Sequence, residues 1–159
     1  MRRLVCLISV GLAGLCPLAV NAEDYLKDGK LKERFELQLL QGGFANYTGT
    51  YYAIEPDGAW SIGPVDVKGQ KGKAKTEGKL TTEQLDKLAQ VFASNDLARL
   101  PPLVPSPLGG PKMTIVAYGF RNSKFSLEPN KTYPPNLKAI ANRYAAIEQT
   151  VKDLCMEMK

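Results

Sequence analysis

Two adjacent glycines, Gly42 and Gly43, interrupt a stretch that otherwise has the pattern of β-strand. Before them, Phe35–Leu39 alternates apolar and polar side chains, the period-two pattern of a strand with one buried face. After them, Asn46–Ile54 is rich in threonine and tyrosine, which suit a pleated surface. Glycine tolerates positive φ and carries no side chain, so the pair predicts a sharp hairpin turn between two strands.

The chain then continues with more strand and turn signals. Pro56-Asp57-Gly58 is a turn signal, and Ala59–Ile62 resumes the sheet, so three strands in sequence predict a meander. Farther on, Met113–Tyr118 and Lys124–Leu127 read as a hairpin with a tight turn at Arg121-Asn122.

Two segments have the periodicity of helices. Thr81 and Gln84 form a capping box that opens the first helix. Its apolar residues follow at helical spacing: Leu85, Leu88, Val91 and Phe92. Pro134-Pro135 precedes the second helix. Its apolar stripe comprises Leu137, Ile140, Ala141, Tyr144, Ile147, Val151 and Leu154. The chain is therefore predicted to be α+β: an antiparallel sheet of about five strands, a meander plus a hairpin, packed by two helices in a single domain.

The N-terminal segment predicts export. Arg2 and Arg3 precede the apolar run Leu4–Leu15, and small residues lead to Ala22. This is the pattern of a signal peptide over residues 1–22, cleaved near Ala22, which predicts a secreted or periplasmic protein. The alternative, an uncleaved anchor, is disfavoured because the apolar run is shorter than the ~20 residues that a membrane span needs.

Removal of this leader leaves a mildly basic chain of 137 residues. Two of the 21 basic residues lie in the leader, which leaves 19 against 16 acidic side chains and a net charge of +3. That charge is too small to indicate nucleic-acid binding. Of the three cysteines only Cys155 remains, so no internal disulfide can form and the core must hold the fold.

The mature chain divides into a lead-in and a domain. Residues 23–34 are mostly charged and predict a frayed start or a short helical lead-in. The α+β domain spans residues 35–159 and contains a lysine- and glycine-rich loop at 68–79. Its lysines are Lys68, Lys71, Lys73, Lys75 and Lys79. We expect a solvated loop, and the functional alternative is a patch for an anionic envelope surface.

Catalytic chemistry has few candidate residues in this chain. It contains no histidine, which excludes Ser-His-Asp and Cys-His catalysis and histidine-bearing zinc sites. One cysteine cannot form a thiolate metal site, and Cys155 lies beside acidic residues near a helix C-terminus, where a thiolate is disfavoured. We therefore expect a non-enzymatic protein that uses no metal or other cofactor.

Two carboxylates and a tryptophan provide the weaker carbohydrate hypothesis. Glu55 and Asp57 flank the turn proline, and Trp60 lies close enough in sequence to stack on a sugar ring. The structural alternative is that the acids are turn formers and that Trp60 belongs to the core.

The residues around the double glycine are the candidate partner-binding site: Gly42, Gly43, Phe44, Ala45 and Tyr47. Two interpretations stay open. Phe44 is either a core plug behind a structural turn or part of a protruding contact loop, where tyrosine and phenylalanine are favoured interface residues.

The order of these features resembles the emfourin family, small proteinaceous inhibitors of thermolysin-like metalloproteases. The resemblance rests on Gln41-Gly42-Gly43-Phe44-Ala45 after a strand, on Gly78-Lys79-Leu80-Thr81 at the start of a helix, and on Asp96–Pro101 at its end. A hairpin and a final helix follow, and the resemblance spans about Phe35 to Leu154. The leader, the lead-in and the lysine-rich insertion depart from that pattern. The resemblance implies action by binding, with a secreted metalloprotease as the partner.

The sequence thus favours an exported protein-binding module that acts as a metalloprotease inhibitor. The alternatives are a cell-envelope domain that is structural or binds an anionic surface, and a carbohydrate-binding protein.

Overall fold

The computed structural model describes residues 21–43, 46–101, 103–104, 112–127 and 134–156. The elements in chain order are η1 (Ala22–Asp24), β1 (Leu26–Lys27), β2 (Lys30–Leu31), β3 (Phe35–Gly43), β4 (Asn46–Ile54), β5 (Ala59–Val65), β6 (Thr76–Lys79), α1 (Thr82–Ser94), η2 (Leu97–Arg99), β7 (Leu103–Val104), β8 (Lys112–Tyr118), β9 (Arg121–Leu127) and α2 (Pro135–Met156). The predicted leader falls almost entirely within residues 1–20, which lie outside the described part of the chain.

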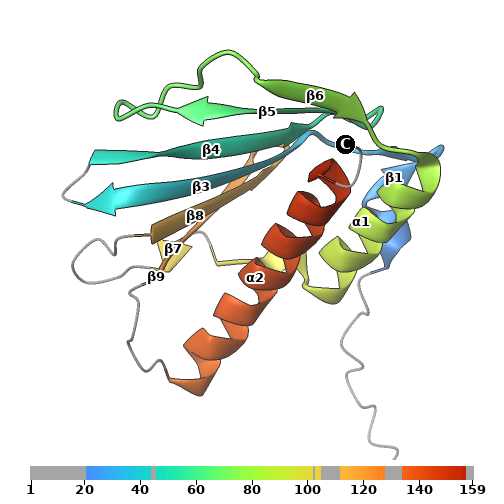
Figure 1. The fold of residues 1–159 in the computed structure, drawn as a ribbon. Coiled ribbons are helices and arrows are strands. Elements are labelled where there is room, and N and C mark those ends of the chain that lie inside the picture. Colours follow the sequence, from blue (N-terminus) through green and yellow to red (C-terminus); the bar gives the residue numbers. More distant parts are fainter. Residues whose placement is uncertain (1–20, 44–45, 102, 105–111, 128–133, 157–159) are drawn as a thin grey trace, which may run out of the picture.

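The predicted α+β class is confirmed. The main sheet has the order β6-β5-β4-β3-β8-β9-β7, in which β7 pairs parallel with β9 and all other pairs are antiparallel. Both helices lie on one face of this sheet, here called the helix face, and neither covers the other, open face (Figure 1). The meander β3–β6 and the hairpin β8–β9 join through the β3–β8 pair, which brings together segments far apart in the sequence.

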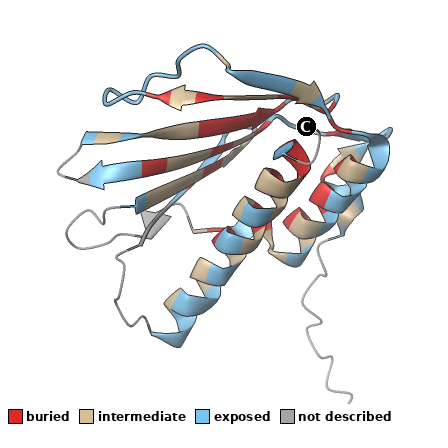
Figure 2. Ribbon diagram, in the orientation of Figure 1, coloured by how far each residue is buried: buried red, intermediate tan, exposed pale blue. Residues whose placement is uncertain are grey.

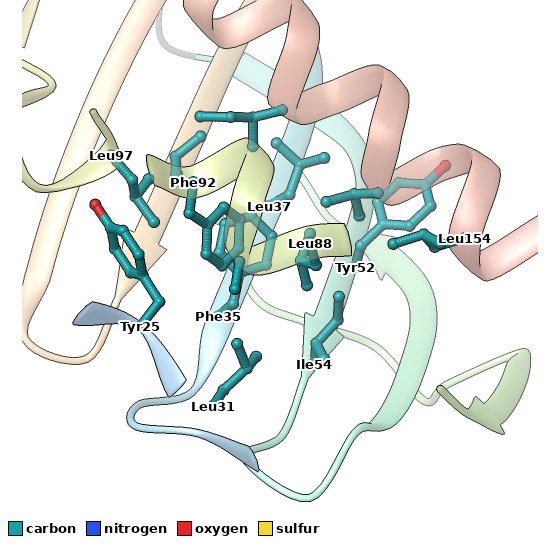
Figure 3. Close-up of a cluster of buried hydrophobic side chains, with 14 of the residues drawn as sticks. Tyr25, Leu31, Phe35, Leu37, Tyr52, Ile54, Leu88, Phe92, Leu97 and Leu154 are labelled. Carbon is teal, nitrogen blue, oxygen red and sulfur yellow. The ribbon is translucent and has the colours of Figure 1, made fainter. Parts of the chain in front are cut away.

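The main core fills the space between the helix face and the two helices. Alternation along β3 and β4 sends Phe35, Leu37, Tyr52 and Ile54 to this face, where all four are buried. The helices contribute Leu88, Phe92, Ile147, Val151 and Leu154 among others (Figures 2 and 3). The predicted apolar stripes of both helices therefore point into the core.

Local signals determine where α1 begins and ends. The Thr81 hydroxyl accepts a hydrogen bond from the Gln84 N–H, and the Gln84 side chain accepts one from the Thr81 N–H, so the predicted capping box is present. Asn95 follows the last helical residue, and Asp96 has φ +48°, which turns the chain into η2. The helix therefore ends just before Asp96–Pro101, the segment that the sequence places at its end.

The strand count is higher than the sequence indicated, because the described residues also include β1, β2, β6 and the two-residue β7. The lead-in at 23–34 was predicted to be frayed or helical, but it forms η1 and the β1–β2 hairpin. Its Tyr25 and Leu31 are only 3% and 2% exposed, so this segment belongs to the main core. The segment at 68–79 was predicted to be a loop, yet Thr76–Lys79 is strand β6, paired with β5 at the edge of the sheet.

The turn of the second hairpin is also displaced from its predicted position. It lies at Gly119 and Phe120, and Arg121 and Asn122 are already paired in β9. Gly119 has φ +57°, a conformation that glycine adopts at low cost, so this glycine and not the Arg-Asn pair determines the turn.

Candidate functional site

The β3–β4 hairpin carries most of the predicted partner-binding residues at its far end. The two strands pair in register up to Gly42 with Tyr47 and Gly43 with Asn46. The glycines are therefore the last paired residues of β3 and not the turn that the sequence predicted. Phe44 and Ala45, which join the strands, lie outside the described residues. This end of the hairpin points away from α1 and from the β1–β2 hairpin (Figure 1).

Glycine is required in this hairpin because the backbones approach closely. Gly42 has φ +151°, and a Cβ atom there would overlap the carbonyl oxygen of Asn46. A Cβ atom on Gly49 would overlap the carbonyl oxygen of Leu39 in the same way. The glycine content of this stretch therefore has a structural cause.

Tyr47 lies on the open face of the sheet and is half-buried. It packs against a second apolar cluster that consists of Leu40, Tyr51, Ala53 and Val65, with Met113 and Ile115 alongside. The Tyr51 ring lies across Gly63, and its hydroxyl donates to the carbonyl of Gly72, 3.3 Å away. The segment after β5 therefore covers part of this face.

A groove lies on the helix face of the same strands, opposite the open face that carries Tyr47. It has a volume of about 560 Å³, and its lining includes Leu39, Gln41, Thr48, Thr50, Pro64 and Lys152. A smaller space of about 150 Å³ adjoins it toward β8 and shares Leu39, Gln41 and Lys152 with it. The Lys152 ammonium lies 2.5 Å from a carboxylate oxygen of Glu148, one turn earlier on α2. The groove is not apparent from the sequence, because its lining comes from β3, β4, β5 and α2.

The groove combines apolar surface with hydrogen-bonding groups. Thr48, Thr50 and Gln41 supply hydroxyl and amide groups from neighbouring strands. Tyr52 closes the side nearest the core, and burial raises the pKa of its hydroxyl, which therefore stays protonated.

Two of the five lysines in the predicted anionic-surface patch form ion pairs with acidic side chains of the protein itself. Lys71 pairs with Glu36 at 2.8 Å, and Lys79 pairs with Asp57 at 3.2 Å. Lys68, Lys73 and Lys75 have no ion pair with the residues that the structure describes. Asp66 accepts hydrogen bonds from the N–H groups of Lys68 and Gln70, so the segment starts as an ordered turn.

The two carboxylates of the carbohydrate hypothesis form structural contacts. Asp57 accepts hydrogen bonds from the Ala59 N–H and from Lys79, and these hold the pKa of Asp57 below its ordinary value. Glu55 pairs with Arg34 at 2.9 Å. Trp60 is 5% exposed in the main core and lies against Gly78, as the structural alternative for this residue expects.

No family model matches the chain, and a search of curated proteins finds no match. Within the described ranges, no helix is both long and apolar enough to cross a membrane. The same ranges hold no group of three or more histidine, cysteine or acidic side chains arranged to bind a metal ion.

Proposed function

We propose that this protein is an exported, non-enzymatic binding module that holds a segment of a partner protein in the groove beside the far end of β3 and β4. The observation that supports the proposal is the groove itself, an open concave surface of about 560 Å³ lined by β3, β4, β5 and α2. Binding sites on proteins are commonly concave, with apolar walls and a few polar groups that set orientation.

The arrangement suits an extended segment of a partner. The hydroxyls of Thr48 and Thr50 and the amide of Gln41 line the same space. Peptide groups of a bound segment can pair with such side chains, while Leu39 and Pro64 offer apolar contact. Because paired strands hold these groups in place, little conformational entropy is lost on binding.

The partner class in this proposal comes from the resemblance to emfourins, whose targets are thermolysin-like metalloproteases. The Gly42-Gly43 end of the hairpin, which carries that resemblance, is continuous with the groove through Gln41 and Thr48. Export, as predicted from the leader, would bring the protein into the compartment where such proteases act.

Inhibition of a thermolysin-like protease tests the proposal. The purified protein is expected to slow peptide hydrolysis in a concentration-dependent, saturable way. Thr50→Tyr places a large side chain in the groove and is expected to raise the inhibition constant about tenfold or more. The reason is that contacts at the centre of an interface carry most of the binding energy, and the tyrosine would block them. The matched control is Thr76→Tyr on edge strand β6, where Thr76 is exposed.

Two results would contradict the proposal in different ways. Undiminished proteolysis at excess protein rejects the metalloprotease as the partner. Inhibition that Thr50→Tyr and Thr76→Tyr leave equally strong rejects the groove as the binding surface.

A further inference from the structure

A second cavity lies at the opposite end of the sheet from the groove. It has a volume of about 300 Å³ and lies between η1, η2 and the hairpin β8–β9. The register places it there, because Phe35 at the start of β3 pairs with Tyr118, which pairs with Arg121. The groove and this cavity are therefore separate.

The walls of the cavity are largely apolar. Leu97, Val116 and the rings of Tyr25 and Tyr118 line it. Figure 3 shows the Tyr25 side chain running alongside Leu97 at the margin of the main core. An apolar lining of this kind favours a ligand with a hydrocarbon or aromatic body.

Hydrogen bonds between distant segments hold these walls together. The Tyr118 hydroxyl donates to the carbonyl of Tyr25 at 3.2 Å, and the Tyr25 hydroxyl accepts from the Ala98 N–H at 3.1 Å. The Ser123 hydroxyl donates to the Leu100 carbonyl at 3.3 Å. The cavity is therefore built before any ligand arrives, which lowers the cost of binding.

Positive charge predominates among the lining residues. Arg99 and Arg121 contribute two guanidinium groups, and Asp24 is the one acid among the described residues that line the space. The Arg121 side chain makes no hydrogen bond or ion pair with the described residues. The nearest acid to Arg99 is Asp96, at 3.8 Å, which Arg143 also contacts at 3.7 Å. Both guanidinium groups can therefore accept an additional anionic partner.

A third donor lies in the wall. The Tyr25 hydroxyl already accepts a hydrogen bond from Ala98, and its own proton has no acceptor among the described residues. Burial raises the pKa of Tyr25, so this hydroxyl keeps its proton in neutral solution.

We infer that this cavity binds an organic carboxylate with a compact apolar body, the carboxylate pairing with Arg99 and Arg121 and the body contacting Leu97, Val116 and Tyr118. Planar guanidinium groups recognise carboxylates through charge-assisted hydrogen bonds. A volume near 300 Å³ is at the lower end for ligand sites, which limits the body to one aromatic ring or a branched aliphatic chain. The carboxylate belongs either to a free small acid or to the C-terminal residue of a peptide. This inference is independent of the proposed function.

Titration of the purified protein with 3-phenylpropionate, monitored by the chemical shifts of backbone amides in NMR spectra, tests the inference. Saturable shifts are expected at Ala98 and Arg121, with 3-phenylpropionamide and acetate binding at least about tenfold more weakly because they lack the charge or the body. Acetyl-Ala-Ala-Leu with a free C-terminus, compared with its amide, tests the peptide source. Saturation by 3-phenylpropionate but not by the peptide assigns the cavity to small free acids. Saturation by the peptide with a free C-terminus shows that the cavity also accepts the C-terminal residue of a peptide.

Matched variants locate the site. Arg121→Gln is expected to weaken 3-phenylpropionate binding about tenfold, as loss of a charge-assisted hydrogen bond would. Lys124→Gln removes the same charge from the opposite face of β9 and is expected to change binding less than twofold, since exposed distant charges are screened. Amide binding equal to that of the acid, shifts confined to other residues, absence of saturation up to about 20 mM, or unaltered affinity in Arg121→Gln would each overturn the inference.

Discussion

The Nζ atom of Lys71 lies 2.8 Å from Oε2 of Glu36, and this ion pair holds the lysine- and glycine-rich segment against the open face of the sheet. The Glu36 side chain is only 12% exposed and also accepts a hydrogen bond from Gln38 at 2.7 Å. The Lys71 ammonium lies 5.9 Å from the centre of the Tyr51 ring. The lysine- and glycine-rich segment is therefore attached to the sheet through the side chain of Lys71.

The first prediction concerns the pH dependence of this pair. Burial alone raises the pKa of Glu36, but hydrogen bonds from Lys71 and Gln38 outweigh it and hold the pKa below its ordinary value. The pair therefore stabilises the fold fully above the unfolded-state pKa of glutamate, and this stabilisation is lost as the pH falls through the lower folded-state pKa. Lys71→Met is expected to lower the free energy of unfolding by about 1 kcal/mol at neutral pH.

Urea denaturation at neutral and at strongly acidic pH measures this effect. The difference between the wild type and Lys71→Met should shrink on acidification, while Lys73→Met, which removes an exposed lysine, should match the wild type at both values. A difference that persists unchanged in acid would contradict the role of the Glu36 charge.

The second prediction concerns the close approach of β3 and β4. Gly49→Ala places a methyl group against the Leu39 carbonyl oxygen, which backbone movement alone can relieve. We expect the free energy of unfolding to fall by about 2 kcal/mol or more. Gly69→Ala is the control: it has open space around it and φ +75°, so it should cost only about 1 kcal/mol. Equal losses in the two variants, measured by chemical denaturation, would argue against a steric requirement at Gly49.

The third prediction tests whether the lead-in is part of the domain. Leu31 is 2% exposed in the main core, so Leu31→Ala is expected to lower the free energy of unfolding by about 2–5 kcal/mol. Its neighbour Lys30 is exposed, and Lys30→Ala should have little effect. Thermal denaturation of both variants measures the difference. A loss below about 1 kcal/mol for Leu31→Ala would mean that the β1–β2 hairpin is a loosely attached segment.

The fourth prediction concerns the thiol of Cys155. It is 4% exposed, and burial raises its pKa to about 12. The folded protein should therefore resist alkylation of this residue by iodoacetamide in mildly alkaline buffer, where an exposed thiol reacts readily. Mass spectrometry of the peptide that contains Cys155 measures labelling, with protein in denaturant as the fully labelled control. Equal labelling with and without denaturant would show that the thiol is accessible, and a disulfide between chains would then be open to it.

Local patterns explain what sequence analysis predicted correctly. The Thr81–Gln84 capping box depends on residues three positions apart, and the apolar stripes of α1 and α2 depend on the helical repeat. The meander and the second hairpin connect strands that are neighbours in sequence. The Gly42-Gly43 pair was correctly associated with the hairpin, but its exact place depended on the pairing of Gly43 with Asn46, which composition cannot specify.

The groove and the cavity were beyond prediction for a different reason. Each is lined by four segments: the groove forms where α2 packs beside β3, β4 and β5, and the cavity forms where η1 and η2 lie against β8 and β9. Arg121 illustrates the point: its sequence context indicated a turn residue, whereas in the structure it lies in β9 and lines the same cavity as Arg99. No periodicity connects these two arginines.

The sequence by itself determined the α+β class, the start of α1 at the Thr81 cap and the absence of histidine, because propensity and capping act over a few residues and composition needs no fold. The tertiary structure decided that Tyr25, Leu31 and Trp60 are core residues, that Lys71 and Lys79 bind acids, and where concave surfaces lie. Burial and ion pairing depend on which distant segments become neighbours, and that is a property of the folded chain as a whole.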